Sequence, residues 1–404
     1  LGSAWVARAA VRRRVLESDA ELFYVYGTPD RTTGLGLFSW PSKYWSTERQ
    51  WIADASASGL FTLGGREHQL MFGVNWSSSD SALRSSDDNL HMRLPPLETW
   101  VSSFPVARPA FDHGVTGQAD FLDRRRSVYA GARLTLTDRI NVITATSVTH
   151  ANSDGQQYGQ PHAYSRTKAS PYLGAVYEFD ARHSVYTSYT QIFNPQSQID
   201  EFHAVLPPIE GRTVEVGAKS EWLGGRVNGT AAVFRAAQRN TAEYAGFADG
   251  ASYYKPVDGT STGLEFEADG LVTRGWHVSA GYTRFKLVGD DGEDIRTFVP
   301  RSTFRVSSTY QVAGLEALTL GATVNWQGDA HRVQGVDPEG NDIVSRQAAY
   351  ALANLMARYG ISRTVSATLH VNNVANTKYY GSLYWPQNYY GAPRHAALTL
   401  NYRF

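Results

Sequence analysis

The sequence predicts an all-β protein, a transmembrane antiparallel up-and-down β-barrel with about sixteen strands. Three observations predict this fold. Apolar and polar residues alternate along most of the chain, very short connections alternate with long ones, and the chain ends on an amphipathic strand. Alternation with a period of two is typical of a strand that has one apolar and one polar environment. We therefore treat residues 1–404 as one β-barrel domain.

Composition agrees with a barrel and excludes several other classes of protein. Hydrophobic residues make up 42% of the 404 residues, and the mean hydropathy is −0.35. No apolar run approaches the roughly 18 residues of a membrane-spanning helix. The formal net charge is zero, which argues against a nucleic-acid partner. The chain has no cysteine, so it has no disulfide, thiolate metal site or cysteine nucleophile.

The strands are predicted from alternating segments in which the apolar residues keep to one parity. The clearest segments are 264–268, 276–282, 304–310, 318–326 and 365–371. Segment 350–359 could form a short helix on propensity, but its neighbours favour a strand.

The connections between these segments alternate in length. Tight turns are expected at 64–65, 137–138, 180–181, 224–225, 274–275, 314–315 and 361–362, and long polar loops such as 87–122, 194–211 and 334–342 lie between them. Short turns on one side and long loops on the other are typical of outer-membrane barrels, with the long loops outside the cell. A soluble propeller has a similar repeat length, but its blades contain four short strands and a Gly-His and Trp-Asp signature that this sequence lacks.

The last strand sets the direction of the two faces. Leu398, Leu400, Tyr402 and Phe404 share one face, and Thr399 lies on the other. A final strand that ends on phenylalanine resembles the terminal signal of bacterial outer-membrane barrels. The apolar face is then expected to meet lipid and the polar face a wet lumen.

A set of ordered segments carries a more specific resemblance. The segments are 188–196, 206–219, 232–235, 238–240, 263–267, 275–283, 371–374, 378–380 and 390–394. Together they resemble the barrel of TonB-dependent ferric-siderophore receptors, of the hydroxamate and pyoverdine type, such as coprogen or ferrichrome receptors. Such receptors have 22 strands, a plug domain and a TonB box. The resemblance therefore implies that this chain is the C-terminal part of the barrel, without the plug and about six strands.

The same resemblance implies a function in iron uptake at the bacterial outer membrane. The expected ligand is a ferric siderophore, and the expected partners are outer-membrane lipid, lipopolysaccharide and, through the missing N-terminal region, the TonB complex. No enzymatic activity, resident cofactor, metal site or nucleic-acid partner is expected. An alternative is a free-standing porin of about sixteen strands that passes small solutes.

Aromatic residues in the outer loops are the candidate ligand-binding residues, because aromatic walls can bury the carbon skeleton of a chelate. The first cluster contains Trp40, Tyr44 and Trp45. The second contains Trp385, Tyr389 and Tyr390, and Tyr158 and Phe193 are further candidates. The alternative is that these side chains form the outer aromatic girdle or pack loops together.

Rows of charge along single strand faces are expected to face the lumen. Arg8, Arg12 and Arg14 form one row, and Glu265, Glu267 and Asp269 form another. A lipid-facing arginine would cost about 2–4 kcal/mol at the midplane. A carboxylate row could suggest acid–base catalysis, but a lumen wall is the simpler interpretation. No Ser/His pair stands out on the apolar parity, as an outer-membrane lipase would need.

Overall fold

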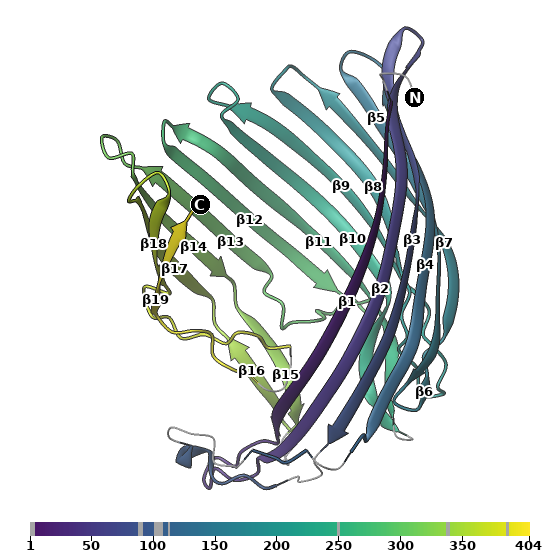
Figure 1. Ribbon diagram of the computed structural model, residues 1–404, viewed down its shortest axis with the longest axis vertical. Coiled ribbons are helices and arrows are strands. Elements are labelled where there is room, and N and C mark those ends of the chain that lie inside the picture. The colour runs from purple at the N-terminus through teal and green to yellow at the C-terminus, as the bar shows by residue number, and fades with distance from the viewer. Residues whose placement is uncertain are drawn as a thin grey trace.

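The computed structural model describes residues 5–87, 92–100, 108–111, 114–248, 251–336, 340–384 and 388–404. These residues form one antiparallel sheet of seventeen strands and a separate two-stranded hairpin. The sheet curves into an incomplete cylinder (Figure 1). No helix among the described residues is long and apolar enough to cross a membrane.

Sixteen of the strands run up and down in chain order, as the alternating segments predict. They are β1 (Trp5–Tyr26), β2 (Phe38–Leu63), β3 (Arg66–Asp87), β4 (Gly117–Thr135), β5 (Ile140–Gln157), β7 (Tyr164–Glu178), β8 (His183–Asn194), β9 (Ile209–Trp222), β10 (Val227–Ala248), β11 (Ala251–Thr273), β12 (Trp276–Val288), β13 (Ser302–Gln311), β14 (Leu318–Gln327), β17 (Tyr350–Gly360), β18 (Val365–Asn372) and β19 (His395–Tyr402). Segment 350–359 is thus a strand and not a helix.

Three shorter strands and one turn of helix belong to the connections. The two-residue β6 (Gln160–Pro161) adds to the end of β5. A hairpin of β15 (Ala330–Val336) and β16 (Asp342–Gln347) forms within the long loop between β14 and β17. The short 3-10 helix η1 (Leu97–Thr99) lies in the connection between β3 and β4.

The predicted tight turns all connect neighbouring strands at one end of the sheet. Gly64 and Gly65 both have positive φ, at 60° and 74°, as a two-residue hairpin turn of type I′ requires. The sequence predicted long loops between the tight turns, but two of these connections are short because their strands continue outward. β10 ends at Ala248 and β11 begins at Ala251, and the hairpin from β5 into β6 turns at Tyr158 and Gly159.

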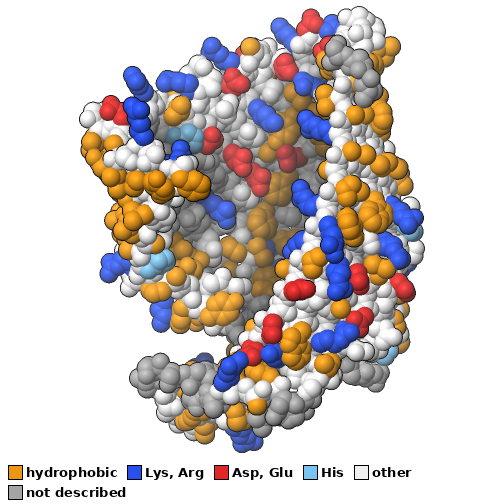
Figure 2. Space-filling model, viewed as in Figure 1, with side chains coloured by type: hydrophobic (Ala, Val, Ile, Leu, Met, Phe, Trp, Pro, Cys, Tyr) orange, Lys and Arg blue, Asp and Glu red, His pale blue; other side chains and the backbone are white. Residues whose placement is uncertain are grey.

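The register shows which side chains share a face, because residues paired across an antiparallel ladder point to the same side. Leu398 pairs with Leu369, which in turn pairs with Ala357, and this apolar set continues from strand to strand. The opposite face carries the charged rows. Acidic side chains gather on the hollowed inner wall of the sheet (Figure 2). The apolar parity of the last strand therefore points outward, as predicted.

Aromatic side chains form a band on the outward face near the tight turns. Its members lie within two residues of a strand end at this side of the sheet, and they are Tyr177, Trp222, Trp276, Tyr310, Tyr359 and Tyr402. Tyrosine and tryptophan favour the boundary between lipid and water. The band marks the periplasmic rim of the barrel, since short turns face the periplasm.

The first three strands extend far beyond the membrane. β1 has 22 residues, whereas crossing the hydrocarbon core takes about 9–11. The outward parity of β1 is mostly apolar from Trp5 to Val15 and becomes acidic at Glu17, Asp19 and Glu21. The strand therefore leaves the lipid near Glu17, and its outer half forms a wall above the membrane.

The sheet does not close on itself within the described residues. β1 pairs with β2 alone, and β19 pairs with β18 alone. Figure 1 shows these two strands as separate edges. All eight residues of β19 are exposed. Because hydrocarbon offers no hydrogen-bond partners, an open edge in lipid leaves polar groups unsatisfied, and both edges require partner strands in a membrane.

Candidate ligand-binding site

A pocket of about 310 Å³ lies at the outer end of β1–β4, above the membrane. Its lining residues are Tyr24, Tyr26, Trp40, Ser42, Tyr44, Ser85, Asp87, Thr116, Gly117 and Tyr158. The register places the strand residues among them on the lumen face, because Tyr24 pairs with Trp40 and Tyr44 with Ser85. Three of the predicted site residues, Trp40, Tyr44 and Tyr158, therefore meet in one pocket.

Aromatic rings form one side of the pocket. Tyr26 stacks on Phe38 with ring centroids 5.9 Å apart, and it contacts Trp40 edge-on at the same distance. Tyr24 lies 6.1 Å from Tyr26. These rings come from facing strands, so the register fixes their spacing. Such rigid aromatic surfaces bind planar or apolar parts of a ligand at little conformational cost.

Polar groups on β2–β4 form the opposite side of the pocket. The Ser42 hydroxyl donates to an Asp87 carboxylate oxygen at 2.8 Å, and the Asp87 amide donates to the Thr116 hydroxyl at 3.0 Å. The Thr116 hydroxyl donates in turn to the Ser85 carbonyl at 3.3 Å. Ser42 is fully buried. The network holds the Asp87 carboxylate in place at the pocket wall.

Tyr158 reaches the pocket from a strained turn. It has a φ of +51° and precedes Gly159 at +77°, so the two residues form the centre of a type I′ hairpin. A bulky residue with positive φ is uncommon and carries a conformational cost of about 1–3 kcal/mol. Its ring lies over Gly117, where a Cβ would approach the ring within 2.9 Å. A side chain at residue 117 would therefore push Tyr158 away from the pocket.

Burial keeps the tyrosines of the pocket protonated. Desolvation raises the pKa of Tyr24, and desolvation together with the Tyr44 phenol and Asp87 raises the pKa of Tyr158. Both phenols therefore remain hydrogen-bond donors well above neutral pH. Phenol donors suit negatively charged oxygen atoms on a ligand.

The connection between β3 and β4 packs against the rim of the pocket. The Leu94 amide donates to the Leu37 carbonyl at 2.9 Å, and the Ser39 amide donates to the Met92 carbonyl at 3.0 Å. Leu94 is only 2% exposed. This buried apolar contact holds the outer ends of the strands together where membrane lipid no longer supports them.

Two predicted residues face away from the pocket. Trp45 lies on the outward parity of β2, paired with Asp19, and the Lys43 ammonium lies 5.2 Å from the centre of its ring. Phe193 is buried at the outer end of β8, also on the outward parity, and pairs with Glu210. The structure brings neither residue to the Trp40 pocket.

The second predicted cluster packs within its own loop. Tyr390 stacks on Tyr380 at 4.9 Å, and the Lys378 ammonium lies 4.1 Å from the Tyr390 ring centre. A hydrogen bond from Tyr380, with help from Lys378, lowers the pKa of Tyr390. Tyr389 is 66% exposed. Trp385 lies outside the described residues.

Neighbouring outer loops are joined by a second group of rings. The Arg332 guanidinium lies 5.4 Å from the Phe298 ring centre and 5.7 Å from that of Tyr384. Phe298 and Tyr384 meet edge-on at 5.3 Å. These three residues come from three different loops. The Tyr384 ring thus packs one loop against another.

Sequence reasoning missed Tyr24 and Tyr26. Both lie on the same parity of β1 as the lumen-facing Arg8 and Arg12. Following this parity to the end of β1 would have predicted them. The structure holds no group of three or more His, Cys, Asp or Glu side chains suited to a metal ion among its described residues.

The sequence matches the family described as "TonB dependent receptor-like, beta-barrel" over residues 2–374. The chain belongs to this family of TonB-dependent receptors. The receptor barrel therefore lies in the outer membrane of a Gram-negative bacterium. The resemblance carried by the ordered segments is confirmed, and so is the predicted antiparallel β-barrel fold.

Several relatives of this receptor barrel are named as siderophore receptors. It is 31% identical to the ferric-pyoverdine BN7/BN8 receptor of Pseudomonas putida over 430 residues, covering 100% of this chain and 50% of the relative. It is 27% identical to the ferrioxamine B receptor of Salmonella typhimurium, covering 87% of this chain and 50% of the relative. The chain thus spans about half the length of these relatives.

Solved structures agree with the fold. The crystal structure of the ferripyoverdine receptor of Pseudomonas aeruginosa bound to ferripyoverdine superimposes with a TM-score of 0.88 at 28% identity. The match covers 98% of this chain and 54% of that one. The ferric-catecholate import receptor of Escherichia coli, at 19% identity and a TM-score of 0.79, shares the fold.

Proposed function

We propose that this receptor barrel is part of an outer-membrane receptor that takes up a ferric siderophore. The observation that carries the proposal is the lumen-facing pocket of Trp40, Tyr44 and Tyr158 at the outer rim, in a chain whose relatives are ferric-pyoverdine and ferrioxamine receptors. The iron arrives already chelated, so the protein supplies a shaped and partly aromatic surface in place of metal ligands.

The pocket chemistry favours a particular kind of chelate. Rings of Tyr26 and Trp40 can cover an apolar or planar portion, and the phenols of Tyr24 and Tyr158 can donate to chelate oxygens. The Asp87 carboxylate adds one negative charge to the wall. A peptide-like hydroxamate chelate with a basic side chain has all three matching parts.

Transport requires elements beyond this chain. The open edges of β1 and β19 need partner strands, and we propose that the remainder of the full-length receptor supplies them. We propose that the same remainder contains the plug and contacts the TonB complex, while outer-membrane lipid and lipopolysaccharide surround the barrel. No resident cofactor is part of the proposal.

Uptake of radioactive iron by cells producing the full-length receptor tests this function. Iron should enter as a complex with pyoverdine-type or ferrioxamine-type hydroxamates, and this uptake should stop when TonB is deleted. The porin alternative predicts passage of many small solutes without TonB. The proposal would be overturned if solute flux persists without TonB and the receptor shows no saturable binding of the chelate.

A further inference from the structure

A pocket of about 490 Å³ lies beside the Trp40 pocket at the outer ends of the strands. Three connections form its walls, namely the hairpin from β5 into β6, the loop between β8 and β9, and the hairpin between β10 and β11. We name this cavity the Gln198 pocket. Tyr158 lines both the Gln198 pocket and the Trp40 pocket, so one side chain borders both cavities.

Main-chain contacts hold the loop between β8 and β9 at the Gln198 pocket. The Tyr254 amide donates to the Ile199 carbonyl at 2.8 Å, which ties the loop to β11. The Leu206 amide donates to the Gln198 carbonyl at 2.8 Å, and Ile199 forms a β-bridge with Val205. Ile199 is only 6% exposed. The loop is therefore anchored at the pocket by its backbone.

The lining of the Gln198 pocket combines uncharged polar groups with aromatic rings. It includes three glutamines and two serines together with Tyr158, Phe247 and Tyr254, and none of the described lining residues is charged. Gln160 and Gln198 are partly buried, and within the described residues their side-chain amides have no hydrogen-bond partner. Because an unpaired amide costs free energy when it loses water, these two groups favour a ligand that forms hydrogen bonds with them.

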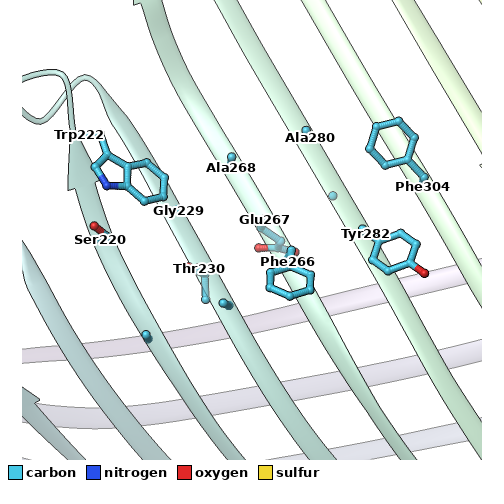
Figure 3. A pocket seen from close by; sticks show the side chains of 13 residues that line it. Ser220, Trp222, Gly229, Thr230, Phe266, Glu267, Ala268, Ala280, Tyr282 and Phe304 are labelled. Carbon is cyan, nitrogen blue, oxygen red and sulfur yellow. The ribbon is translucent and has the colours of Figure 1, made fainter.

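A cavity of different chemistry lies on the outward face of β9–β13 (Figure 3). Its volume is about 400 Å³, and the rings of Trp222, Phe266, Tyr282 and Phe304 lie along it. Phe266 pairs with Tyr282, and Tyr282 with Phe304, on the lipid-facing parity. This cavity belongs to the apolar surface that meets lipid. The amides and hydroxyls of the Gln198 pocket suit a polar ligand that arrives from outside the cell.

The two pockets at the outer rim are close enough to hold one molecule. Gln160 follows Tyr158 by two residues, so the two Cα atoms lie within about 7 Å of each other. A peptide spans that distance with about two residues. The Asp87 carboxylate of the Trp40 pocket has no charged counterpart among the described lining residues of the Gln198 pocket. The pockets therefore suit two chemically different parts of one ligand.

We propose that the Gln198 pocket binds an uncharged peptide arm of the ferric chelate, while the part that carries the iron occupies the Trp40 pocket. This inference rests on the proposed function and adds a second subsite to it. Glutamine amides and serine hydroxyls both donate to and accept from peptide groups, and aromatic rings cover apolar parts of the arm. A charged group on the arm would lose water without gaining a partner, so the pocket should select against it.

Binding of three synthetic iron(III) trihydroxamates to the full-length receptor tests this inference. They share one iron-binding core, and the arm is absent, Gly-Ser-Gly or Gly-Asp-Gly. Quenching of intrinsic fluorescence should show that the Gly-Ser-Gly complex binds about tenfold more tightly than the armless complex. The Gly-Asp-Gly arm should give no gain in affinity. In the unaltered receptor, the Gly-Ser-Gly complex alone should slow hydrogen exchange in segments 157–161 and 197–199.

Variants of the two free glutamines locate the arm. Gln160→Ala combined with Gln198→Ala should reduce the tenfold preference to about twofold, because the arm loses both amide partners. Gln156→Ala is the matched control and should keep the preference, since this side chain lies on the opposite face of β5 from Gln157. A preference that survives in the double variant would place the arm elsewhere.

Failure of this inference can be told from failure of the proposed function. Equal affinities of the armless and Gly-Ser-Gly complexes for the unaltered receptor would overturn the second subsite alone, because the shared core would still bind. If none of the three complexes binds, the proposed function fails together with the subsite.

Discussion

The aromatic clusters near residues 38–45 and 379–390 have similar compositions and different environments. In the first cluster, Trp40 and Tyr44 sit on long paired strands, so the ladder with β1 and β3 fixes their direction. In the second, Tyr380 and Tyr390 sit in an irregular loop and stack on each other. The lumen-facing rings of β2 therefore reach the pocket, whereas Tyr380 and Tyr390 pack against each other within their loop.

Strand length explains this difference. β2 has 26 residues and β3 has 22, far more than a membrane crossing needs, whereas β18 and β19 have eight each. The first region therefore carries a rigid scaffold into the space above the membrane. In the second region the strands are short, and the chain beyond them forms an irregular loop. Binding sites on strands are more precise than sites on loops, so we expect the first region to dominate ligand affinity.

Both regions have an outward apolar face. Placing a charged side chain on this face should cause the largest loss of stability. Leu369→Arg places a charge on the lipid face of β18 and should lower stability by about 2–4 kcal/mol. His370→Arg, on the adjacent lumen position, should change stability far less. Urea unfolding of the full-length receptor in lipid vesicles measures both. Equal losses of stability in the two variants would mean that Leu369 does not face lipid or that His370 does not face the lumen.

Removing the strand-borne tryptophan should separate the two clusters most clearly. Trp40→Ala removes a wall of the pocket and should weaken ferric-chelate binding by about 2 kcal/mol, or roughly 30-fold. Trp45→Ala is the matched control, because Trp45 lies one strand position from Tyr44 on the other face. Ligand quenching of intrinsic fluorescence gives both dissociation constants. A larger effect of Trp45→Ala would place the ligand elsewhere.

The contributions of the Tyr158 hydroxyl and its ring can be measured separately. Tyr158→Phe keeps the ring and should cost about 1 kcal/mol in binding, about fivefold, if the phenol donates to the chelate. Tyr158→Asn removes the ring but suits the left-handed conformation, so the hairpin should become more stable while binding falls further. Titration calorimetry and protease resistance report the two effects. Loss of hairpin stability in Tyr158→Asn would show that the ring also supports the loop.

The loop-borne cluster should respond more weakly. Tyr390→Ala removes the partner of Tyr380 and Lys378. We expect the loop between β18 and β19 to become more sensitive to protease, while chelate affinity changes less than twofold, since surface contacts are usually worth under 0.5 kcal/mol. A loss as large as that of Trp40→Ala would contradict the difference between the clusters.

Most of the fold follows from local sequence. Alternation in 365–371 and 398–404 predicts both strands and their outward faces, because the period of two and the tight turns are local properties. The lengths of β10 and β11 were not predicted, since their outer halves are paired in solvent and lose the apolar parity that marks a membrane strand.

The site was predicted less completely for a physical reason. Aromatic composition identifies candidates, but only the pairing of Ala20 with Tyr44 and Asp19 with Trp45 decides which of two adjacent residues faces the lumen. A register error of one residue would exchange them. Tyr158 depends on a turn conformation, and the stacking of Tyr380 on Tyr390 depends on contacts within an irregular loop. Neither can be derived from periodicity.

A small pH effect should be confined to the connection between β5 and β7. His162, in the connection between β6 and β7, is 7% exposed and stacks on Phe121 at 4.0 Å. Burial lowers its pKa, and the Asp123 carboxylate 3.9 Å away opposes this shift.

The folded loop therefore favours neutral imidazole at His162, while the unfolded loop takes up a proton near pH 6.5. Its stability is complete above that pH and is lost as the pH falls toward the lower folded value. The protection factors of amides in segment 158–163, which compare the intrinsic exchange rate with the observed one, should thus fall as the pH is lowered from 7.5 to 5.5. Those in the loop between β18 and β19, whose shifted groups are tyrosines, should not fall. His162→Phe keeps the stacking and should remove the effect. A fall in protection that persists in this variant would assign the pH dependence to another group.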